Sequence, residues 1–286
     1  MRIGIDINER NINAVILTRN DITKFEEKSI YDVKRDTNRV IMDKLISIIH
    51  KSTESRIKGI GLSLPSRIDE KRGVIFDLTK IPYWKGHGIK KILEDEFNTR
   101  IWINNDVNCC MLAEKHHGSC MKHKNILCIH IDCHVAAGIT VNGKLFVGDN
   151  DMFNHSKCLS TPCYDYICVY KESFIRTVEE LNFLCSRFNK NKFFPNKEEA
   201  WDEFGTLLGR LISILFQNYK FEAVVLDGRL GKSNCEYVNT MNEYIAKYIH
   251  VQNLPVYTSS IMYSKALGAT SLIDSQDVLP YEPQYS

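Results

Sequence analysis

The chain contains two similar blocks, and in each a group of short predicted strands is followed by predicted helices. This repetition constrains the fold more than any other feature of the sequence. Strands are predicted in the first block at 1–7, 12–18, 25–32, 58–65 and 99–103, and in the second at 125–131, 137–141, 144–147 and 223–226. Helices are predicted at 36–53, 88–97, 109–117, 170–188, 198–219 and 234–249. Strands alternating with helices are typical of α/β proteins. Because no low-complexity segment or linker separates the blocks, we expect two closely joined halves.

Size, charge and hydropathy exclude several classes of protein. The 286 residues can bury a substantial core and are enough for two lobes. A net charge of +2, with Lys and Arg scattered along the chain, gives no electrostatic support for nucleic acid binding. No apolar run approaches the roughly 18 residues of a membrane span, and the Met1-Arg2-Ile3-Gly4 start lacks a signal-peptide pattern. We expect no nucleic acid partner and no membrane partner.

Cysteine usage indicates a reducing compartment. Half of the ten cysteines lie inside apolar runs, namely Cys109, Cys110, Cys128, Cys168 and Cys185. Cysteines buried in such runs are typical of free thiols, because disulfides are rare in the cytosol. The sequence therefore predicts a cytoplasmic protein.

The stretch Ile103-Asn104-Asn105-Asp106-Val107-Asn108 places one carboxylate among amides between a β-prone segment and a helix-prone segment. A strand-to-helix turn has free backbone N–H groups nearby, so Asp106 is well placed to act as a general base. The alternative is that the amides and Asp106 form a turn and N-cap cluster that holds only its own backbone. The stretch alone leaves both interpretations open.

Seven motifs, taken in order, carry a resemblance that covers almost the whole chain. They are Gly4-Ile5-Asp6-Ile7, Gly61 to Asp69, Ile81-Pro82-Tyr83-Trp84, Ile103 to Asn108, Val141 to Leu145, Val225 to Leu230, and Ala266 to Ala269. The order of these motifs resembles that in the ROK proteins, a family of repressors, uncharacterised open reading frames and sugar kinases with the actin-like ATPase fold. The resemblance implies two actin-like (ribonuclease H-like) lobes with a cleft between them. The expected lobes are residues 1–117 and 118–286, with a last helix at about 263–274 that packs back on the first lobe.

The resemblance implies a hexose site. In the family's kinases, the aspartate that matches Asp106 takes the proton from a sugar hydroxyl, which is a weak nucleophile. Asn105, His155 and Asp165 match positions that hold the sugar, while Met152 replaces the glutamate of the family's Glu-x-x-His pair. From the residues alone, His155 can be a surface-loop histidine and Asp165 a turn acid. The expected sugar site is therefore recognisable but altered.

Both phosphate loops depart from the family pattern. The first loop reads Asp6-Ile7-Asn8-Glu9-Arg10-Asn11, so Glu9 adds a negative charge where glycines should admit ATP. The second reads Asp132-Cys133-His134-Val135-Ala136-Ala137-Gly138, in which a carboxylate and a bulky ring oppose a triphosphate. These loops are degenerate, which argues against efficient catalysis.

Some nucleotide-site residues are retained. Asp6 is the residue expected to coordinate Mg²⁺, directly or through water. Gly138, Gly228 and Gly231 match glycines of the family's nucleotide loops. For Gly228 and Gly231, an ordinary strand-to-helix turn explains the glycines equally well. ATP and Mg²⁺ are the expected cofactors if the protein is an active enzyme.

The zinc motif of the family is also incomplete. Cys158 and Cys163 keep the spacing of two of its cysteines, but Ser156 stands where the first should be, and a closed structural site needs four ligands. With His155, three ligands remain at most. The alternative is a pair of neutral thiols in a loop.

Three functions from different classes fit parts of this pattern. The first is an ATP-dependent hexose kinase, weak in turnover, with Asp106 as base; Asp106-Val107-Asn108 and the stretch 259–269 look most like D-allose kinases. The second is an impaired pseudokinase that acts as a sugar-binding sensor or regulator. The third, a ROK repressor, is disfavoured because Asp6 lies too near the start for a preceding DNA-binding domain. Family members are often dimers, and the aromatic residues around Phe188 suit either a dimer contact or the core.

Overall fold

The structure is a computed structural model, in which the chain forms two compact units. The residues described are 1–8, 11–18, 22–30, 38–51, 57–65, 67–69, 74–77, 88–146, 171–189, 196–233, 236–250, 253–274 and 278–279. The first unit comprises Met1–Met121 and Ser260–Val278, and the second comprises Lys122–Ser259 and Leu279–Ser286. Among the described helices, none combines the length and the apolar character that crossing a bilayer demands.

The first unit is built on a mixed five-stranded sheet with the order β3-β2-β1-β4-β7. The strands are β1 (Arg2–Ile7), β2 (Asn11–Leu17), β3 (Ile22–Ile30), β4 (Gly59–Leu64) and β7 (Ile101–Asn105). The hairpin β1–β2 is antiparallel, whereas β4 is parallel to both β1 and β7. A separate antiparallel ribbon joins β5 (Arg67–Asp69) to β6 (Val74–Asp77). The parallel strands therefore end at one edge, where loops bring their polar residues together.

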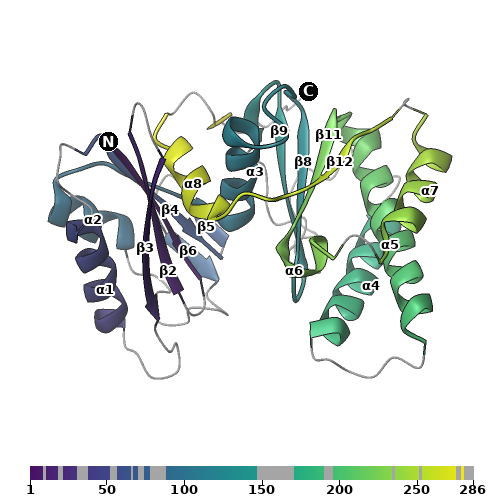
Figure 1. Cartoon of the computed structure of the whole chain (residues 1–286), viewed down its shortest axis with the longest axis horizontal. Coiled ribbons are helices and arrows are strands. Elements are labelled where there is room, and N and C mark those ends of the chain that lie inside the picture. Colours follow the sequence, from purple (N-terminus) through teal and green to yellow (C-terminus); the bar gives the residue numbers. More distant parts are fainter. Residues whose placement is uncertain are drawn as a thin grey trace. The chain divides into compact units, whose positions relative to one another are not determined.

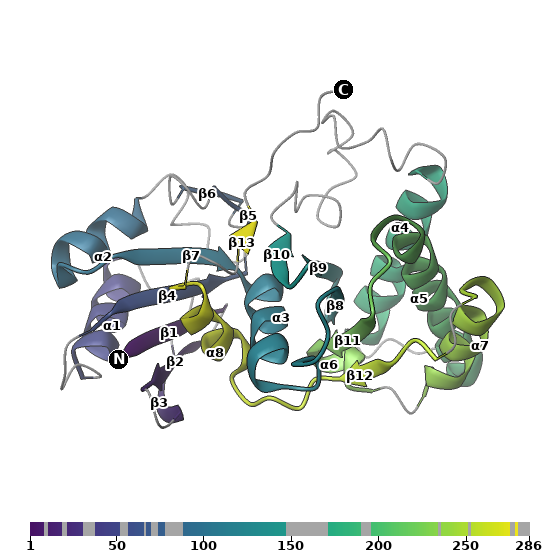
Figure 2. The same ribbon diagram turned by 90° about the horizontal axis from the view of Figure 1, so that it is seen from above.

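Helices cover both faces of this sheet. One face, including Ile3, Ile5 and Ile7, packs on α1 (Asn38–Lys51) and α2 (Ile89–Phe97) in a single apolar cluster. On the other face lie α3 (Asp106–His117) and α8 (Ser264–Ser271), and Figure 2 shows α8 beside β1 and next to α3. Because successive side chains of a strand point to opposite faces, Gly4 and Asp6 share the face that meets α8. The last helix, although distant in sequence, is part of the first unit.

The second unit has a six-stranded sheet with the order β12-β11-β8-β9-β10-β13. The strands are β8 (Ile126–Ile131), β9 (Val135–Val141), β10 (Lys144–Phe146), β11 (Ala223–Asp227), β12 (Val256–Thr258) and β13 (Val278–Leu279). The helices are α4 (Lys171–Asn189), α5 (Lys197–Tyr219), the short α6 (Gly228–Gly231) and α7 (Val238–Tyr248). Figure 1 shows α4, α5 and α7 grouped to one side of these strands. Their apolar faces join the sheet in one core.

Aromatic residues hold the helices of the second unit together. The rings of Phe188 and Trp201 stack with their centroids 3.9 Å apart, and Phe204 meets both edge-on. Tyr237 packs on Trp201 and Phe204 and donates its hydroxyl to the carbonyl of Gly231 at 2.9 Å. Because Phe188 is buried here, core packing explains its aromatic character.

Most of the predicted elements are present, and the differences lie at their ends. Helix α3 begins at Asp106 rather than at Cys109, and β9 begins at Val135, so the predicted second phosphate loop is a three-residue turn followed by a strand. The short strands β5, β6 and β12 and the single-turn helix α6 were not expected from the sequence. The buried cysteines Cys109, Cys110, Cys128 and Cys185 are free thiols, as expected.

Candidate functional site

Asp106 lies where β7 ends and α3 begins. Asn105 is the N-cap of α3, and its side-chain oxygen accepts a hydrogen bond from the backbone N–H of Asn108 at 2.8 Å. Asn104 is buried and accepts from the backbone N–H of Asn105 at 2.7 Å and from the side-chain amide of Asn108 at 2.9 Å. The amides of this stretch thus fix the turn itself, as the N-cap interpretation requires. They hold Asp106 at the first residue of the helix.

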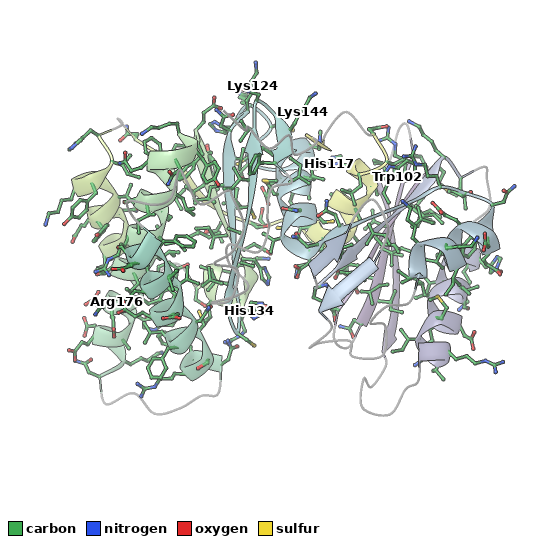
Figure 3. All side chains as sticks on the ribbon, turned by 180° about the vertical axis from the view of Figure 1, so that it is seen from behind. Trp102, His117, Lys124, His134, Lys144 and Arg176 are labelled. Carbon is green, nitrogen blue, oxygen red and sulfur yellow. The ribbon has the colours of Figure 1, made fainter. Side chains whose placement is uncertain are left out.

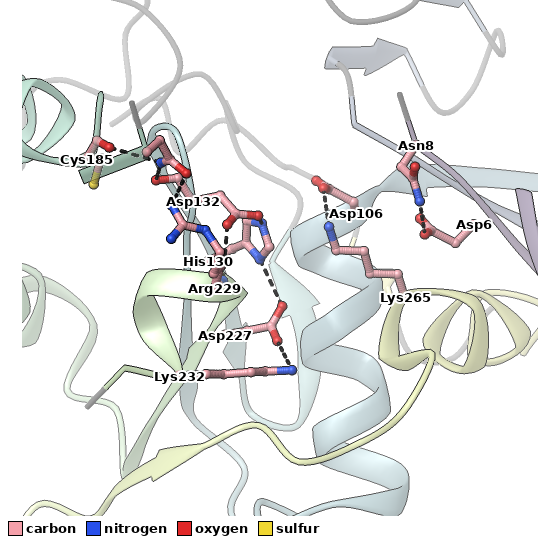
Figure 4. Close-up of polar contacts among 11 residues, drawn as sticks. Asp6, Asn8, Asp106, His130, Asp132, Cys185, Asp227, Arg229, Lys232 and Lys265 are labelled. Atoms are coloured by element: carbon pink, nitrogen blue, oxygen red, sulfur yellow. Dashed lines mark hydrogen bonds and ion pairs between the residues drawn. The ribbon is translucent and has the colours of Figure 1, made fainter. Parts of the chain in front are cut away.

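The carboxylate of Asp106 forms an ion pair with Lys265. The ammonium donates to Oδ2 of Asp106 at 2.8 Å, as Figure 4 shows, and the side chains are only 21% and 15% exposed for Lys265 and Asp106. Lys265 is the second residue of α8. A pair this sheltered from water is stronger than an exposed one. The residue predicted to act as the base is therefore engaged with a cation from the last helix.

Asp6 completes a cluster of three charged side chains in the first unit. It is 5% exposed at the end of β1, where it accepts from the hydroxyl of Ser63 at 3.0 Å and from the amide of Asn8 at 3.4 Å. Burial raises the pKa of Asp6 above its ordinary value, and the charge of Asp106 raises it further, while Lys265 and the two hydrogen bonds oppose the increase. The ammonium thus acts on both carboxylates.

Glycines on the sheet and on α8 place Lys265 next to these carboxylates. A side chain at Gly4 would overlap the carbonyl oxygen of Ala266, and one at Gly61 would overlap that of Ala269. A side chain at Gly268 would overlap the carbonyl oxygen of Cys109 in α3. The absence of these side chains lets the helix approach the strands closely. Backbone contact on two sides fixes where the first turn of α8 begins.

The residues of this cluster do not fit a magnesium site. Mg²⁺ requires oxygen ligands in near-octahedral geometry, but Asp106 is paired with an ammonium and both oxygens of Asp6 accept hydrogen bonds. Across the described residues, no group of three or more His, Cys, Asp and Glu side chains could hold a metal ion. The expectation that Asp6 coordinates Mg²⁺ has no support in this arrangement.

A second polar network lies in the second unit around His130. This histidine is on β8 opposite Asp227 of the parallel strand β11, and its Nδ1 is 2.8 Å from Oδ2 of Asp227. Its Nε2 lies 3.3 Å from Oδ2 of Asp132, and Lys232 approaches Oδ1 of Asp227 at 3.3 Å (Figure 4). A carboxylate can only accept, so a doubly protonated ring satisfies both neighbours. His130 therefore bridges the ends of two strands.

The turn after β8 is held by further contacts. Oδ1 of Asp132 accepts the backbone N–H of Arg229 at 3.1 Å, and the guanidinium of Arg229 donates to the side chain of Asn189. Asn189 in turn donates to the carbonyl of Asp132 at 2.6 Å. Burial, with the charge of Asp132 as a second cause, raises the pKa of the Cys185 thiol to about 12, so this thiol is neutral at pH 7. His134 lies in the same turn (Figure 3).

These residues do not fit a polyphosphate. Asp132 places a carboxylate in the turn where the resemblance expects phosphate, and it already accepts the backbone N–H of Arg229, which an anion would need. Asp227 lies in the stretch that resembles the adenosine site and pairs with His130. Like charges at close range cost energy on the order of kcal/mol. The contacts therefore involve both the predicted second phosphate loop, through Asp132, and the stretch that resembles the adenosine site, through Asp227 and Arg229.

Of the glycines predicted to contact nucleotide, Gly228 is the one whose backbone turn itself requires glycine. Gly228 has a φ of +84°, and a side chain there would overlap the carbonyl oxygen of Ile131, so the turn itself requires glycine. Gly138 is buried within β9 opposite Cys128. A side chain at Gly231 would make an ordinary contact with Leu226 at 3.4 Å. The ordinary-turn interpretation therefore accounts for Gly228.

The predicted sugar-loop and zinc residues fall outside the described part of the chain. These residues are Met152, His155, Ser156, Cys158, Cys163 and Asp165. Their roles as sugar or zinc ligands therefore stay predictions from the sequence.

Two side chains that are central to these networks were not recognised from the sequence. Lys265 is the one cation among small residues in Ser264-Lys-Ala-Leu-Gly-Ala-Thr-Ser271, and His130 is the one basic side chain in the apolar strand Ile126–Ile131. An isolated ionisable residue in an otherwise apolar or small-residue segment was the available signal, since charged groups are rarely buried unless they are paired.

Comparisons with known proteins agree with this architecture. The sequence model of the ROK family matches residues 2–275. A xylose repressor of Bacillus subtilis strain 168 is 22% identical over 308 residues, covering 95% of this chain and 76% of that protein. Among solved structures, a ROK hexokinase from Thermus thermophilus superposes with a TM-score of 0.73 at 18% identity, covering 96% of this chain and 99% of that one. A ROK glucokinase from Streptomyces griseus, solved with glucose and AMPPNP, superposes with a TM-score of 0.67 at 16% identity, again covering 96% of this chain and 99% of that one. Relatives thus include both kinases and repressors.

Proposed function

The chain belongs to the ROK family and has the actin-like ATPase fold of its kinases, and on that premise we propose that it binds a hexose and serves as a sugar sensor, with phosphoryl transfer weak or lost. The sugar would contact Asp106 and the side-chain amide of Asn105, with His155 and Asp165 as further ligands. The proposed protein is a pseudokinase built on a sugar-kinase fold.

The ion pair between Asp106 and Lys265 is the observation that carries this proposal. A general base must accept the hydroxyl proton as the bond to phosphorus forms. An ammonium 2.8 Å from the carboxylate stabilises its ionised form, which opposes proton uptake. The carboxylate can still accept a hydrogen bond from a sugar hydroxyl. Recognition of the sugar is therefore compatible with the pair, whereas efficient deprotonation is not.

The second unit supports the same proposal independently. Asp132, in the predicted second phosphate loop, contacts His130 and the backbone N–H of Arg229, and Asp227, in the stretch that resembles the adenosine site, pairs with His130. Binding the triphosphate of ATP would require these contacts to break. Both the acceptor side and the donor side of the transfer are thus disfavoured.

A slow ATP-dependent hexose kinase is the second candidate. The position of Asp106 in the first turn of α3, beside Asn105, favours it, because that geometry suits a base once Lys265 moves aside. D-allose is the first hexose to test, on the likeness of Asp106-Val107-Asn108 and the stretch 259–269 to D-allose kinases. For either candidate we propose a cytoplasmic location, a homodimer, and no nucleic acid or membrane partner.

Calorimetric titration with hexoses, with and without Mg-ATP, tests the proposal. Allose, glucose and N-acetylmannosamine are titrated into the full chain, and ³¹P NMR of the same mixtures detects any sugar phosphate. We expect one hexose to bind with an affinity that Mg-ATP does not change, and no sugar phosphate to form. The variant Asp106→Asn should keep that affinity within about tenfold, because an amide oxygen still accepts a hydrogen bond.

Two outcomes would overturn the sensor proposal. Formation of a sugar phosphate that Asp106→Asn abolishes, but that the exposed-site control Asp95→Asn does not, would establish the slow kinase instead. Failure of every hexose to bind, while the protein is folded, would remove both candidates.

A further inference from the structure

We propose that Lys265 is a built-in cation that takes the place of a divalent metal ion in the first unit. This inference concerns the charge balance of Asp6, Asp106 and Lys265, and it stands whether or not a hexose binds. Phosphoryl transfer from ATP in kinases and ATPases generally uses metal ions that neutralise charge on the phosphates. Here a side chain supplies the positive charge.

The charges of the cluster are the first step. Asp6 is 5% exposed, and Asp106 is 15% exposed in its side chain, so both carboxylates are largely withdrawn from water. Two such groups repel each other unless a cation lies near both. The ammonium of Lys265 pairs directly with Asp106 and also acts electrostatically on Asp6. One lysine therefore pairs with Asp106 and partly offsets the burial of Asp6, at a place where a metal ion could otherwise lie between two carboxylates.

The packing of α8 is the second step. Because backbone contacts at Gly4, Gly61 and Gly268 fix this helix, the point from which the lysine side chain extends is set by the fold. An ammonium also offers three donors and no acceptor, so its presence excludes a second cation from the same place. The cluster is thus preorganised for a monovalent ammonium.

The contrast with a surface ion pair shows that this contact is not incidental. Lys91 and Asp95 form a pair of similar length, 3.1 Å, on the solvent face of α2, with side chains 80% and 65% exposed. Exposed pairs of that kind contribute little, about 0 to 1 kcal/mol. Lys265 instead bridges two elements that are far apart in sequence. An ordinary surface charge does not need such placement.

A metal-free cluster has a chemical consequence for the ligand. If Lys265 supplies the positive charge, no divalent ion is available to bridge a protein carboxylate and a phosphate. The ligand that fits is uncharged, and its binding is independent of Mg²⁺. Removal of the lysine should convert the two carboxylates into a site that attracts divalent cations.

Titration of the full chain with Mn²⁺, followed by electron paramagnetic resonance, tests the inference. We expect the wild-type protein to show no site that depends on Asp106, and Lys265→Met to bind Mn²⁺ more tightly by on the order of tenfold or more, since the carboxylates lose their counter-ion. Lys91→Met removes the same charge from the surface pair and should bind no more Mn²⁺ than wild type. Lys265→Arg keeps the charge and should behave like wild type.

The outcomes separate cleanly. Binding of Mn²⁺ by the wild type that Asp106→Asn abolishes would overturn the proposal, and so would a folded Lys265→Met that gains no affinity over Lys91→Met. If Lys265→Met is unfolded, addition of Mn²⁺ or Mg²⁺ should restore its circular dichroism. Failure of both ions to restore it would also overturn the proposal, because a metal would then be unable to replace the lysine.

Discussion

The two units both place buried carboxylates at the ends of parallel strands, but they neutralise them by different means. In the first unit the counter-charge comes from Lys265, which is 159 residues from Asp106 in sequence and is delivered by a separate helix. In the second unit Asp227 has two such partners, His130, which faces it through the register of neighbouring strands, and the ammonium of Lys232 at 3.3 Å. The first arrangement depends on helix packing, and the second depends on sheet pairing.

The difference also concerns the chemistry of the cation. A lysine ammonium keeps its charge across the physiological pH range, whereas a histidine is charged only when it is protonated. The cation of the first unit is therefore charged at any physiological pH, whereas the charge that His130 adds to the network of the second unit depends on its protonation. Mutations that disturb the packing of α8 should therefore destabilise the first unit, and mutations that disturb the contacts of His130 should destabilise the second.

The largest effect is expected from Gly268→Ala, which prevents the close packing of α8 that places Lys265 beside Asp106. The new methyl group would overlap the carbonyl oxygen of Cys109, and overpacking against backbone should lower the free energy of unfolding by about 3 kcal/mol. Urea unfolding measures the loss, and hydrogen exchange should locate it in the first unit. Gly231→Ala is the matched control, because its methyl group would meet Leu226 at an ordinary 3.4 Å. Equal losses in the two variants would contradict the close approach of α8.

A smaller loss is expected from His130→Ala, which breaks the network of the second unit. Asp227 is 3% exposed and would keep Lys232 as a charged partner in the part of the chain that the structure describes, so the free energy of unfolding should fall by about 2 kcal/mol. Urea unfolding at pH 7 provides the measurement. His50→Ala, whose ring is 57% exposed and 3.1 Å from Glu96, should cost less than about 1 kcal/mol. A loss no greater than that of the control would show that the bridge is not stabilising.

The smallest change is expected from Asp6→Asn, and its sign depends on pH. Because the pKa of Asp6 is raised in the folded state, the ionised carboxylate destabilises the fold, and the wild type loses stability as the pH rises from 3.8 through the folded pKa. The amide of the variant still accepts a hydrogen bond from the hydroxyl of Ser63, but it carries no charge. The variant should therefore gain stability relative to wild type as the pH rises toward 7, in thermal melts at several pH values. If the stability of the variant relative to wild type instead fell with rising pH, the attraction of Lys265 for the Asp6 carboxylate would outweigh the effect of burial on its pKa.

Part of this comparison was accessible from the sequence. Apolar periodicity located the strands and most helices, and the amide-rich stretch before Asp106 located the end of β7. Lys265 and His130 were missed because each depends on contacts far along the chain, which periodicity does not report. One local signal was present in retrospect: Gly4 and Asp6, like Gly61 and Ser63, are spaced by two, so one face of each strand has room for a helix and then a polar group.

The phosphate loops illustrate the opposite case. The carboxylate of Asp132 and the bulky ring of His134 predicted that phosphate would be opposed, and the structure adds that Asp132 accepts the backbone N–H of Arg229 and so holds that turn. The glycine motif predicted nucleotide contact at Gly228, yet its positive φ serves the backbone turn. A glycine in a sequence motif shows that the position needs a small or conformationally free residue. It does not show whether a ligand or the backbone turn imposes that need.

The position of α8 has a consequence for how the chain is made. The second unit draws its described helices from one continuous stretch, 122–259, whereas the first unit needs residues 260–278 to be complete. During synthesis, the sheet face around Gly4 and Gly61 therefore has no α8 to pack against until that helix has left the ribosome. Until then the apolar side chains of Val15 and Ala113 are not covered by α8. Domains fold as units as they emerge. The charge cluster of the first unit thus forms only after all the described helices of the second unit have been translated.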